Sequence, residues 1–204
     1  MAAGPLGDRT GAYLTLRDAA GSVEVRFTDL PGLLYQITTP PDAGLTPQVN
    51  GPAGHPRVRL RPTGGDGPDT VRILLNRTVR WDIRLPAGGG EQRLDLRGGR
   101  LAGVRLGAAG LVVLNLPSPD RAVPITLSGA VGACTLATPA GTAVRLRLRE
   151  GARRAVVPWA GDREAEPGET FAARGWTEAG DGYAVDAHGT IGTLTAREVP
   201  SRRT

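Results

Sequence analysis

Apolar and polar residues alternate along most of the chain. The alternation is clear in Leu14-Thr15-Leu16, from Val23 to Phe27 and from Val79 to Leu85, where every second side chain is apolar. A period of two places the apolar side chains on one face of a β-strand. Apolar residues at helical spacing never persist for the roughly 11 residues that an amphipathic helix needs. The sequence therefore predicts an all-β fold.

The middle of the chain repeats this alternation at a period near ten. Two apolar residues flank one polar residue, and a turn rich in Gly, Pro or Ser follows. The successive pairs, at steps of 10, 10, 11, 9 and 12 residues, are Leu94/Leu96, Val104/Leu106, Leu114/Leu116, Ile125/Leu127, Cys134/Leu136 and Leu146/Leu148. This period suits the half-turn of a β-solenoid with two strands per coil. We predict a solenoid-like stack of short strands, with a β-sandwich as the alternative, because short strands at this spacing also build sandwiches.

The expected organisation is one all-β domain spanning residues 10–198. Its regular centre is expected at about residues 78–157, with atypical segments on either side, because the terminal repeats of a solenoid must cap an open core. Residues 1–9 and 199–204 are expected to be frayed termini.

The composition predicts a narrow core with few aromatic residues and a surface with a net positive charge. The chain of 204 residues has only three Trp, three Tyr and two Phe, which fits a narrow aliphatic interior. The formal net charge is +5, and all 25 basic residues are arginine, whose charge persists at any accessible pH. Such a surface attracts anionic partners. Nucleic acid is not the expected partner, because aromatic residues do not interleave with the arginines as stacking platforms require.

One arginine cluster is a candidate interaction face. Arg145, Arg147 and Arg149 alternate with leucine and are expected on one face of a strand, followed by Arg153 and Arg154. These five are the candidate interaction residues. If the coils stack, Arg105 or Arg97 is expected to extend the face into a strip. Such a strip would attract an anionic glycan, an envelope polymer or lipid headgroups; the alternative is that the arginines are solvated and bind nothing.

Three carboxylates within one expected coil offer a catalytic alternative: Asp82, Glu91 and Asp95. Hydrolysis of a glycosidic bond needs two carboxyl groups roughly 5–10 Å apart, one of them with a raised pKa. Arginines alternate with these acids, and a neighbouring arginine lowers the pKa of a carboxylate. We therefore expect a surface charge ladder here, and no catalytic residues.

Other chemistry is not visible in the sequence. His55 and His188 lie far apart, so no metal site is expected, and no cofactor motif is present. Cys134 occupies an apolar strand position, where a small buried side chain is expected. No apolar stretch is long enough for a transmembrane helix, and the residues from Met1 onward do not resemble a signal peptide, which by itself indicates the cytoplasm.

The segment WDIRLPAGGGEQRLDLRGGRLAGVRLGAAGLVVLNLP, from Trp81 to Pro117, resembles the putative-adhesin domains of actinobacterial envelope proteins. The resemblance covers about residues 70–160 and rests on the repeated strands and Gly corners. It implies a β-solenoid with a non-catalytic envelope or interaction role, often tethered by a signal or transmembrane segment. This sequence departs from that pattern because it shows no such segment.

Three functions follow as hypotheses. The first is a non-catalytic interaction protein, associated with the cell envelope, that presents an arginine-rich strand face to an anionic polymer or a protein. The second is an enzyme that acts on acidic polysaccharide through Asp82, Glu91 or Asp95. The third is a cytoplasmic scaffold that binds a partner by adding a strand to an open end of the solenoid.

Overall fold

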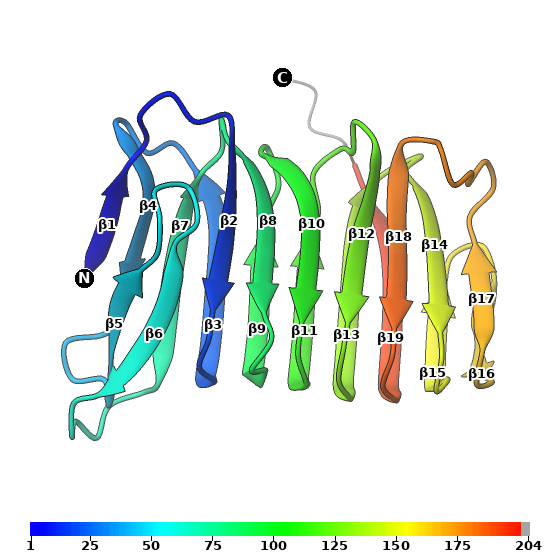
Figure 1. Ribbon diagram of the computed structural model, residues 1–204. Helices are drawn as coiled ribbons and strands as arrows, with labels where there is room; N and C mark the ends of the chain where they lie inside the picture. The colour runs from blue at the N-terminus through cyan, green and yellow to red at the C-terminus, as the bar shows by residue number, and fades with distance from the viewer. Residues whose placement is uncertain (201–204) are drawn as a thin grey trace.

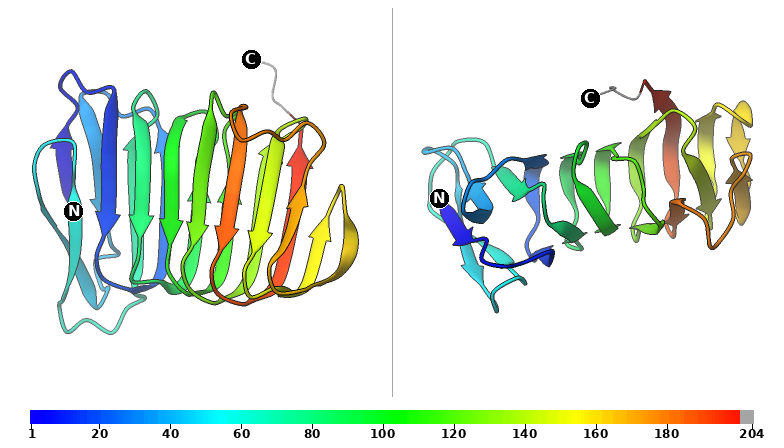
Figure 2. Two further views of the ribbon diagram at one scale, coloured as in Figure 1. Left: turned by 45° about the vertical axis from the view of Figure 1, so that its right-hand side comes forward. Right: turned by 90° about the horizontal axis from the view of Figure 1, so that it is seen from above.

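The computed structural model describes residues 1–200, which form two facing β-sheets (Figure 1). Sheet A has ten strands and sheet B has nine, and the described residues contain no helix. No helix in this part of the chain is therefore available to cross a membrane. Sheet B faces the viewer in Figure 1, and the view from above shows the two sheets lying face to face (Figure 2). The all-β prediction is confirmed.

Most of the strands belong to coils, each of which runs along sheet B and returns along sheet A. Neighbouring coils pair in parallel in both sheets, which is a solenoid-like arrangement. In spatial order, the coils are β6/β7 (Arg57–Pro62, Thr70–Asn76), β2/β3 (Gly11–Leu16, Ala20–Thr28), β8/β9 (Arg80–Leu85, Gly89–Asp95), β10/β11 (Arg100–Leu106, Ala109–Asn115), β12/β13 (Ala122–Leu127, Val131–Pro139), β18/β19 (Gly182–Ala187, Ile191–Val199) and β14/β15 (Ala143–Leu148, Ala152–Val157).

The core lies between the two sheets and is made of the alternating apolar residues. All twelve residues of the six predicted pairs are 3% exposed or less. Successive pairs belong to alternate sheets, so a unit of about ten residues is one half-turn, as predicted. The buried side chains form one hydrophobic cluster that extends from β2 to β19.

The coils are not stacked in chain order. The first coil along the chain, β2/β3, lies between β6/β7 and β8/β9. The last coil, β18/β19, lies between β12/β13 and β14/β15 (Figure 1). The predicted regular centre at residues 78–157 was therefore too narrow, because residues 11–28, 57–76 and 182–199 also supply parallel coils.

Antiparallel strands cap both ends of the stack. At the N-terminal end these are β4 (Leu33–Thr38) and β1 (Ala2–Pro5) in sheet A and β5 (Leu45–Asn50) in sheet B. At the other end, β16 (Gly161–Ala165) closes sheet A and β17 (Glu169–Ala172) closes sheet B. These edge strands close the stack at both ends.

The expectation of frayed termini was wrong where the structure describes them. Residues 2–5 form β1, because their backbone pairs with β4, and Leu6 N–H donates to the carbonyl of Gly32 at 2.9 Å. At the other end Val199 is the last residue of β19 and pairs with Pro139. Residues 201–204 of the predicted C-terminal tail lie outside the described residues.

Asn76 is the last residue of β7 and stabilises the turn between β7 and β8. This turn connects two coils that lie on either side of the coil β2/β3. The side-chain amide of Asn76 donates to the carbonyls of Leu30 (2.9 Å) and Leu33 (2.8 Å), and its side-chain oxygen accepts from the backbone and hydroxyl of Thr78. Its own carbonyl accepts the indole N–H of Trp81 at 2.9 Å. Asn76 is only 3% exposed, and both polar atoms of its side chain are paired.

Candidate anion-binding face

Outward-facing side chains line up in rows across sheet B because its central strands are parallel and in register. Neighbouring strands in such a sheet lie about 4.8 Å apart, and so do equivalent side chains. One row is rich in arginine, and we call it the arginine row. Its members, in spatial order, are Arg57, Thr15, Arg84, Arg105, Thr126, Asp186 and Arg147.

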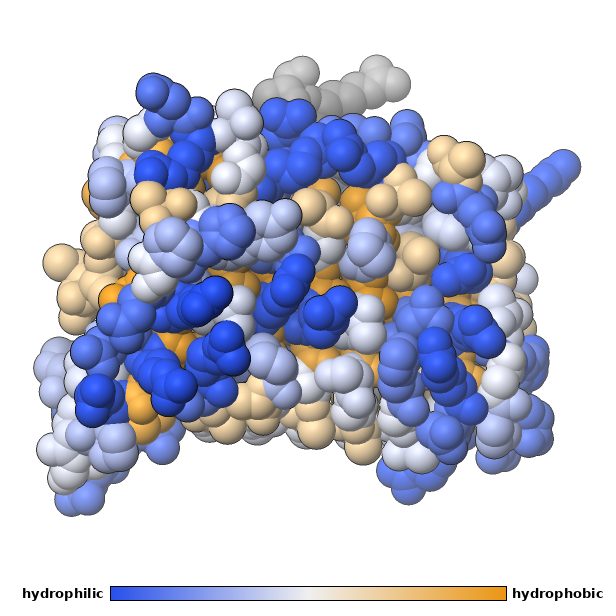
Figure 3. All heavy atoms as spheres, in the orientation of Figure 1, coloured by the Kyte–Doolittle hydropathy of each residue, from blue (hydrophilic) through white to orange (hydrophobic). Residues whose placement is uncertain are grey.

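A shallow groove of about 230 Å³ opens at the N-terminal end of this row. It lies on β2, β6 and β8, where hydrophilic side chains gather in the space-filling view (Figure 3). Its lining residues are Tyr13, Thr15, Arg17, His55, Arg57 and Arg84.

The segment before β6 builds one wall of the groove. Regular pairing between β2 and β6 begins only at Thr15 and Arg57. Before that point, the Tyr13 N–H donates to the carbonyl of Gly54 at 2.9 Å, and the Thr15 N–H donates to the carbonyl of Pro56 at 3.1 Å. Gly54 has φ of +87°, a conformation that glycine adopts readily. This turn places the exposed His55 beside the strand that carries Tyr13.

Tyr13 organises the groove through contacts on its ring. Its ring centroid lies 4.5 Å from that of His55, and Cζ of Arg84 lies 5.6 Å from it. Arg84 also donates two hydrogen bonds to Asp82, at 2.9 and 3.0 Å. This pairing raises the pKa of the Arg84 guanidinium, which stays charged. Arg84 is therefore held in place before any ligand binds.

Positive charge without a carboxylate partner is concentrated beside this groove. Arg57 and Arg59 lie on β6, and Arg17 follows the adjacent strand β2. Within residues 1–200, no carboxylate lies within 4.0 Å of a guanidinium nitrogen of these three arginines. Asp18 is directed elsewhere, since it accepts the backbone N–H of Leu60 at 2.8 Å. On sheet A, Arg72 and Arg93 each contact a glutamate, whereas Arg26, Arg153 and Arg197 have no such contact within residues 1–200.

The predicted arginine strip is only partly assembled. Arg145 and Arg147 face outward on β14 of sheet B, and Arg149 follows that strand, as alternation predicts. Arg153 and Arg154 lie on β15 in sheet A, because the chain turns from one sheet to the other after residue 148. The five candidates therefore do not form one strip.

The five candidate arginines also differ in their contacts, because some of them pair with carboxylates. Arg145 is occupied, since it contacts Asp186 at 3.1 Å and lies with its Cζ 5.7 Å from the centroid of Trp176. Arg154 pairs with Asp162 at 2.7 Å. Of the two expected extensions, Arg105 lies in the same row as Arg147. Arg97 does not, because it follows β9 of sheet A and pairs with Asp95.

The three candidate acids are not brought together. Asp82 faces outward from β8 in sheet B, whereas Glu91 and Asp95 lie on β9 in sheet A. Each contacts an arginine two residues along its own strand, at 2.7–3.0 Å. The hydrogen bonds from Arg97 lower the pKa of Asp95, as the alternating arginines predict. These residues therefore do not form the close acid pair that hydrolysis of a glycosidic bond needs.

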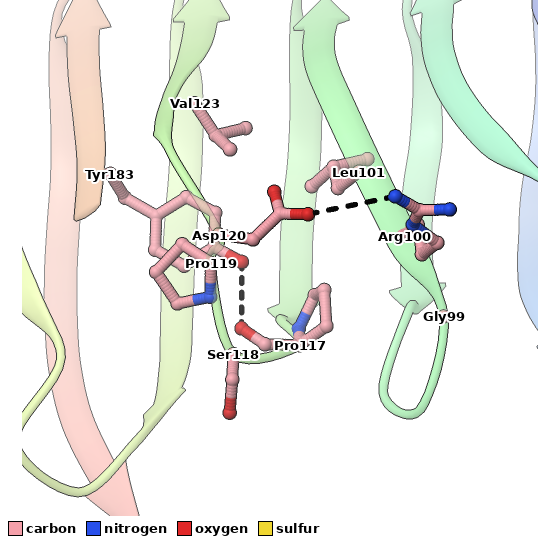
Figure 4. A pocket seen from close by; sticks show the side chains of 9 residues that line it. All are labelled: Gly99, Arg100, Leu101, Pro117, Ser118, Pro119, Asp120, Val123 and Tyr183. Carbon is pink, nitrogen blue, oxygen red and sulfur yellow. Dashed lines mark hydrogen bonds and ion pairs between the residues drawn. The ribbon is translucent and has the colours of Figure 1, made fainter. Parts of the chain in front are cut away.

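A second, smaller hollow is structural. It measures about 30 Å³, room for about one water molecule. The Tyr183 hydroxyl there donates to the carbonyl of Pro117 at 2.7 Å, and the Asp120 carboxylate faces Arg100 (Figure 4). Asp120 also accepts a hydrogen bond from Arg80 at 2.8 Å, which lowers the pKa of its carboxyl to about 2. These contacts join neighbouring coils and leave no room for a larger ligand.

The remaining reactive side chains form no site in the part of the chain that the structure describes. Cys134 is buried, as predicted, and its burial raises the pKa of the thiol to about 12. No group of three or more His, Cys, Asp or Glu side chains in residues 1–200 is placed to hold a metal ion.

Sequence reasoning missed the groove. The run Arg57-Val58-Arg59-Leu60-Arg61 alternates as Arg145–Arg149 does, so this part of the signal was visible. The sequence did not show that Arg57 lies near Arg17 and Tyr13. Their proximity depends on the pairing of β6 with β2, which follows from the order of the coils.

Comparisons with known proteins support the fold. No family model matches the chain, and no curated protein matches it. A crystal structure of a putative cell adhesion protein from Clostridium sporogenes is similar, with a TM-score of 0.69 over 97% of this chain and 98% of that one, at 15% sequence identity. The likeness is one of fold.

Proposed function

We propose that this protein is a non-catalytic binding protein of the cell envelope that presents the arginine row of sheet B to an anionic polymer. The observation that carries the proposal is the line of arginines on parallel, in-register strands, of which Arg57, Arg105 and Arg147 contact no carboxylate within residues 1–200. The similar clostridial structure is that of a putative cell adhesion protein, which supports a placement at the envelope.

The shape of the face favours a polymer over a small substrate. Sites for small molecules are usually enclosed, mostly apolar cavities of about 300–1,000 Å³. The groove here is smaller, shallow and polar, and it continues into an exposed row of side chains. A surface of this kind suits a ligand that repeats its charged groups along its length.

Two other kinds of partner fit the surface less well. Binding to a membrane surface uses exposed apolar side chains, and the large hydrophobic side chains exposed within residues 1–200 are those of Met1 and Tyr13 alone. Strand addition needs an open, regular edge. The edge strands here contain Pro47 in β5, end at Pro5 in β1, and expose Asp162, Arg163 and Glu164 in β16.

Binding to soluble anionic polymers tests the proposal. The variant Arg57→Gln/Arg105→Gln/Arg147→Gln removes three unpaired charges from sheet B. The matched control Arg26→Gln/Arg153→Gln/Arg197→Gln removes three exposed charges from sheet A. Each exposed ion pair is worth up to ~1 kcal/mol, and ~1.4 kcal/mol is tenfold in affinity. We expect the sheet B variant to lose at least about tenfold and the control to lose little. Equal losses would mean that only net charge attracts the polymer and would refute the proposal.

A further inference from the structure

We infer that the groove of Tyr13, Thr15, Arg17, His55 and Arg57 is the anchoring subsite for one acidic sugar, and that the polymer is an acidic polysaccharide running across the strands along the arginine row. This inference rests on the proposed function and specifies its ligand.

Two arginines supply the anion-binding part of the subsite. Arg57 is paired with Thr15 in the ladder, and the Arg17 N–H donates to the carbonyl of Val58 at 2.9 Å, so the two arginines project from adjacent strands, two positions apart. Their backbones are separated by roughly 8 Å, from strand spacings of about 4.8 Å and a rise of about 3.4 Å per residue. Two long side chains converge across that distance on one carboxylate, which the guanidinium fork binds through paired hydrogen bonds.

Other polar groups in the same groove suit the hydroxyls of a sugar. The hydroxyls of Tyr13 and Thr15 and the ring nitrogens of His55 line the groove, and none of them hydrogen-bonds another group within residues 1–200. The row also mixes threonine with arginine: Thr15 lies between Arg57 and Arg84, and Thr126 lies beside Arg105. A polysaccharide offers carboxylates and hydroxyls in turn, whereas a polyphosphate offers only anionic oxygens. The presence of both hydroxyl and guanidinium groups on this face favours the polysaccharide.

The groove is poorly suited to a nucleobase. Bases bind to single-stranded recognition surfaces by stacking on aromatic faces. The one large aromatic ring exposed among the described residues is Tyr13, and it already contacts His55 and Arg84. The edge and hydroxyl of Tyr13 remain available for hydrogen bonding.

The row sets the direction and minimum length of the ligand. Arg105 lies three strands from Arg57, which is about 14 Å at the spacing of a β-sheet. One sugar in the groove does not reach that far, whereas an oligosaccharide laid across the strands does. Affinity is therefore expected to rise with oligosaccharide length until Arg105 is engaged.

Titrations of the full chain with uronate oligosaccharides of increasing length, and with polyphosphate of matched charge, test the inference. The double variant Arg17→Gln/Arg57→Gln should lose at least about tenfold in affinity at every uronate length. Arg105→Gln should weaken only the longer oligosaccharides. Tyr13→Phe and Thr15→Val keep the shape of the groove and remove its hydroxyls, so they should weaken uronate binding severalfold and leave polyphosphate binding unchanged. Arg26→Gln/Arg153→Gln on sheet A is the control.

The outcomes separate the inference from the proposed function. If polyphosphate binds as tightly as the uronates, or if Tyr13→Phe and Thr15→Val have no effect, the polysaccharide subsite is refuted while binding to sheet B stands. If Arg105→Gln weakens short and long oligosaccharides alike, the proposed direction of the polymer is wrong. If no polyanion binds, or the sheet A control loses as much as the groove variant, the proposed function fails as well.

Discussion

Two buried polar residues of similar chemistry have opposite environments. Asn76 satisfies its side chain with four hydrogen bonds at the corner before β8. Gln92 is fully buried on β9, between Val23 and Val112 of the neighbouring strands, and neither polar atom of its side chain has a partner within residues 1–200. A buried amide without partners costs about 1–3 kcal/mol. Asn76 therefore stabilises the fold, and Gln92 weakens it.

Replacing Gln92 by leucine should stabilise the protein. Gln92→Leu keeps a similar volume and removes the unpaired groups, so we expect the free energy of unfolding to rise by about 1–3 kcal/mol. Urea unfolding measures the change. Asn76→Leu leaves the carbonyls of Leu30 and Leu33 without their donor, so it should lower the free energy of unfolding by about 2–4 kcal/mol. A stability loss in Gln92→Leu would show that the amide has a role that its surroundings do not reveal.

Asp120 should make stability depend on pH in the acid range. Its folded-state pKa of about 2 lies below the ordinary value of 3.8, chiefly because Arg80 hydrogen-bonds to the carboxylate. Protons therefore bind the unfolded chain more tightly, and the stabilisation present above pH 3.8 is lost as the pH falls towards 2. Urea unfolding at several pH values should show a shallower loss for Asp120→Asn than for the unchanged protein. Parallel curves would contradict this role for Asp120.

At the scale of elements, the last coil along the chain, β18/β19, is inserted between two coils that precede it in the sequence. β18 pairs with β12 on one side and β14 on the other, while β19 pairs with β13 and β15. Without this coil, the strands on either side would be two spacings apart, about 9.6 Å, which is too far for backbone hydrogen bonds. The segment from β14 to β17 therefore depends on the C-terminal strands for its attachment to the rest of the molecule.

Cys134 reports on this insertion because it pairs with Leu194 of β19. Leu194 is 1% exposed, so Leu194→Asp buries a charge and should displace β18/β19. The Cys134 thiol should then react with a thiol reagent in native buffer, although it is protected in the unchanged protein. Thr195→Asp, on the outward face of the same strand, is the control and should leave the thiol protected. Continued protection in Leu194→Asp would show that the last coil is not needed to close the core.

The sequence predicts the local features of this fold but not the order in which its coils stack. The strands and the ten-residue unit were readable because alternation and Gly-rich turns are local features, and Arg105 falls in the row of Arg147 once strands stack. The order of the coils was not readable, since β2, β6, β12 and β18 have the same length and alternation and any of them could be neighbours. The groove depends on that order, and so it became visible only in the structure.

At the scale of the whole molecule, the two outer faces differ. In the middle of sheet A, the outward side chains of Val113, Thr135 and Thr195 lie in one row and are uncharged and half-buried. Sheet B carries the arginine row and the groove, with antiparallel caps at both ends. The molecule is flat, with one face suited to an extended anion, and we propose that binding is confined to that face.

The most direct measurement is an NMR titration that follows the Nε–Hε signals of the arginine side chains while an acidic polysaccharide is added. We expect the signals of Arg17, Arg57, Arg84 and Arg105 to shift together and saturate, and those of Arg72 and Arg93 on sheet A to stay in place. Shifts spread equally over both sheets, or signals on sheet B that do not move, would contradict it.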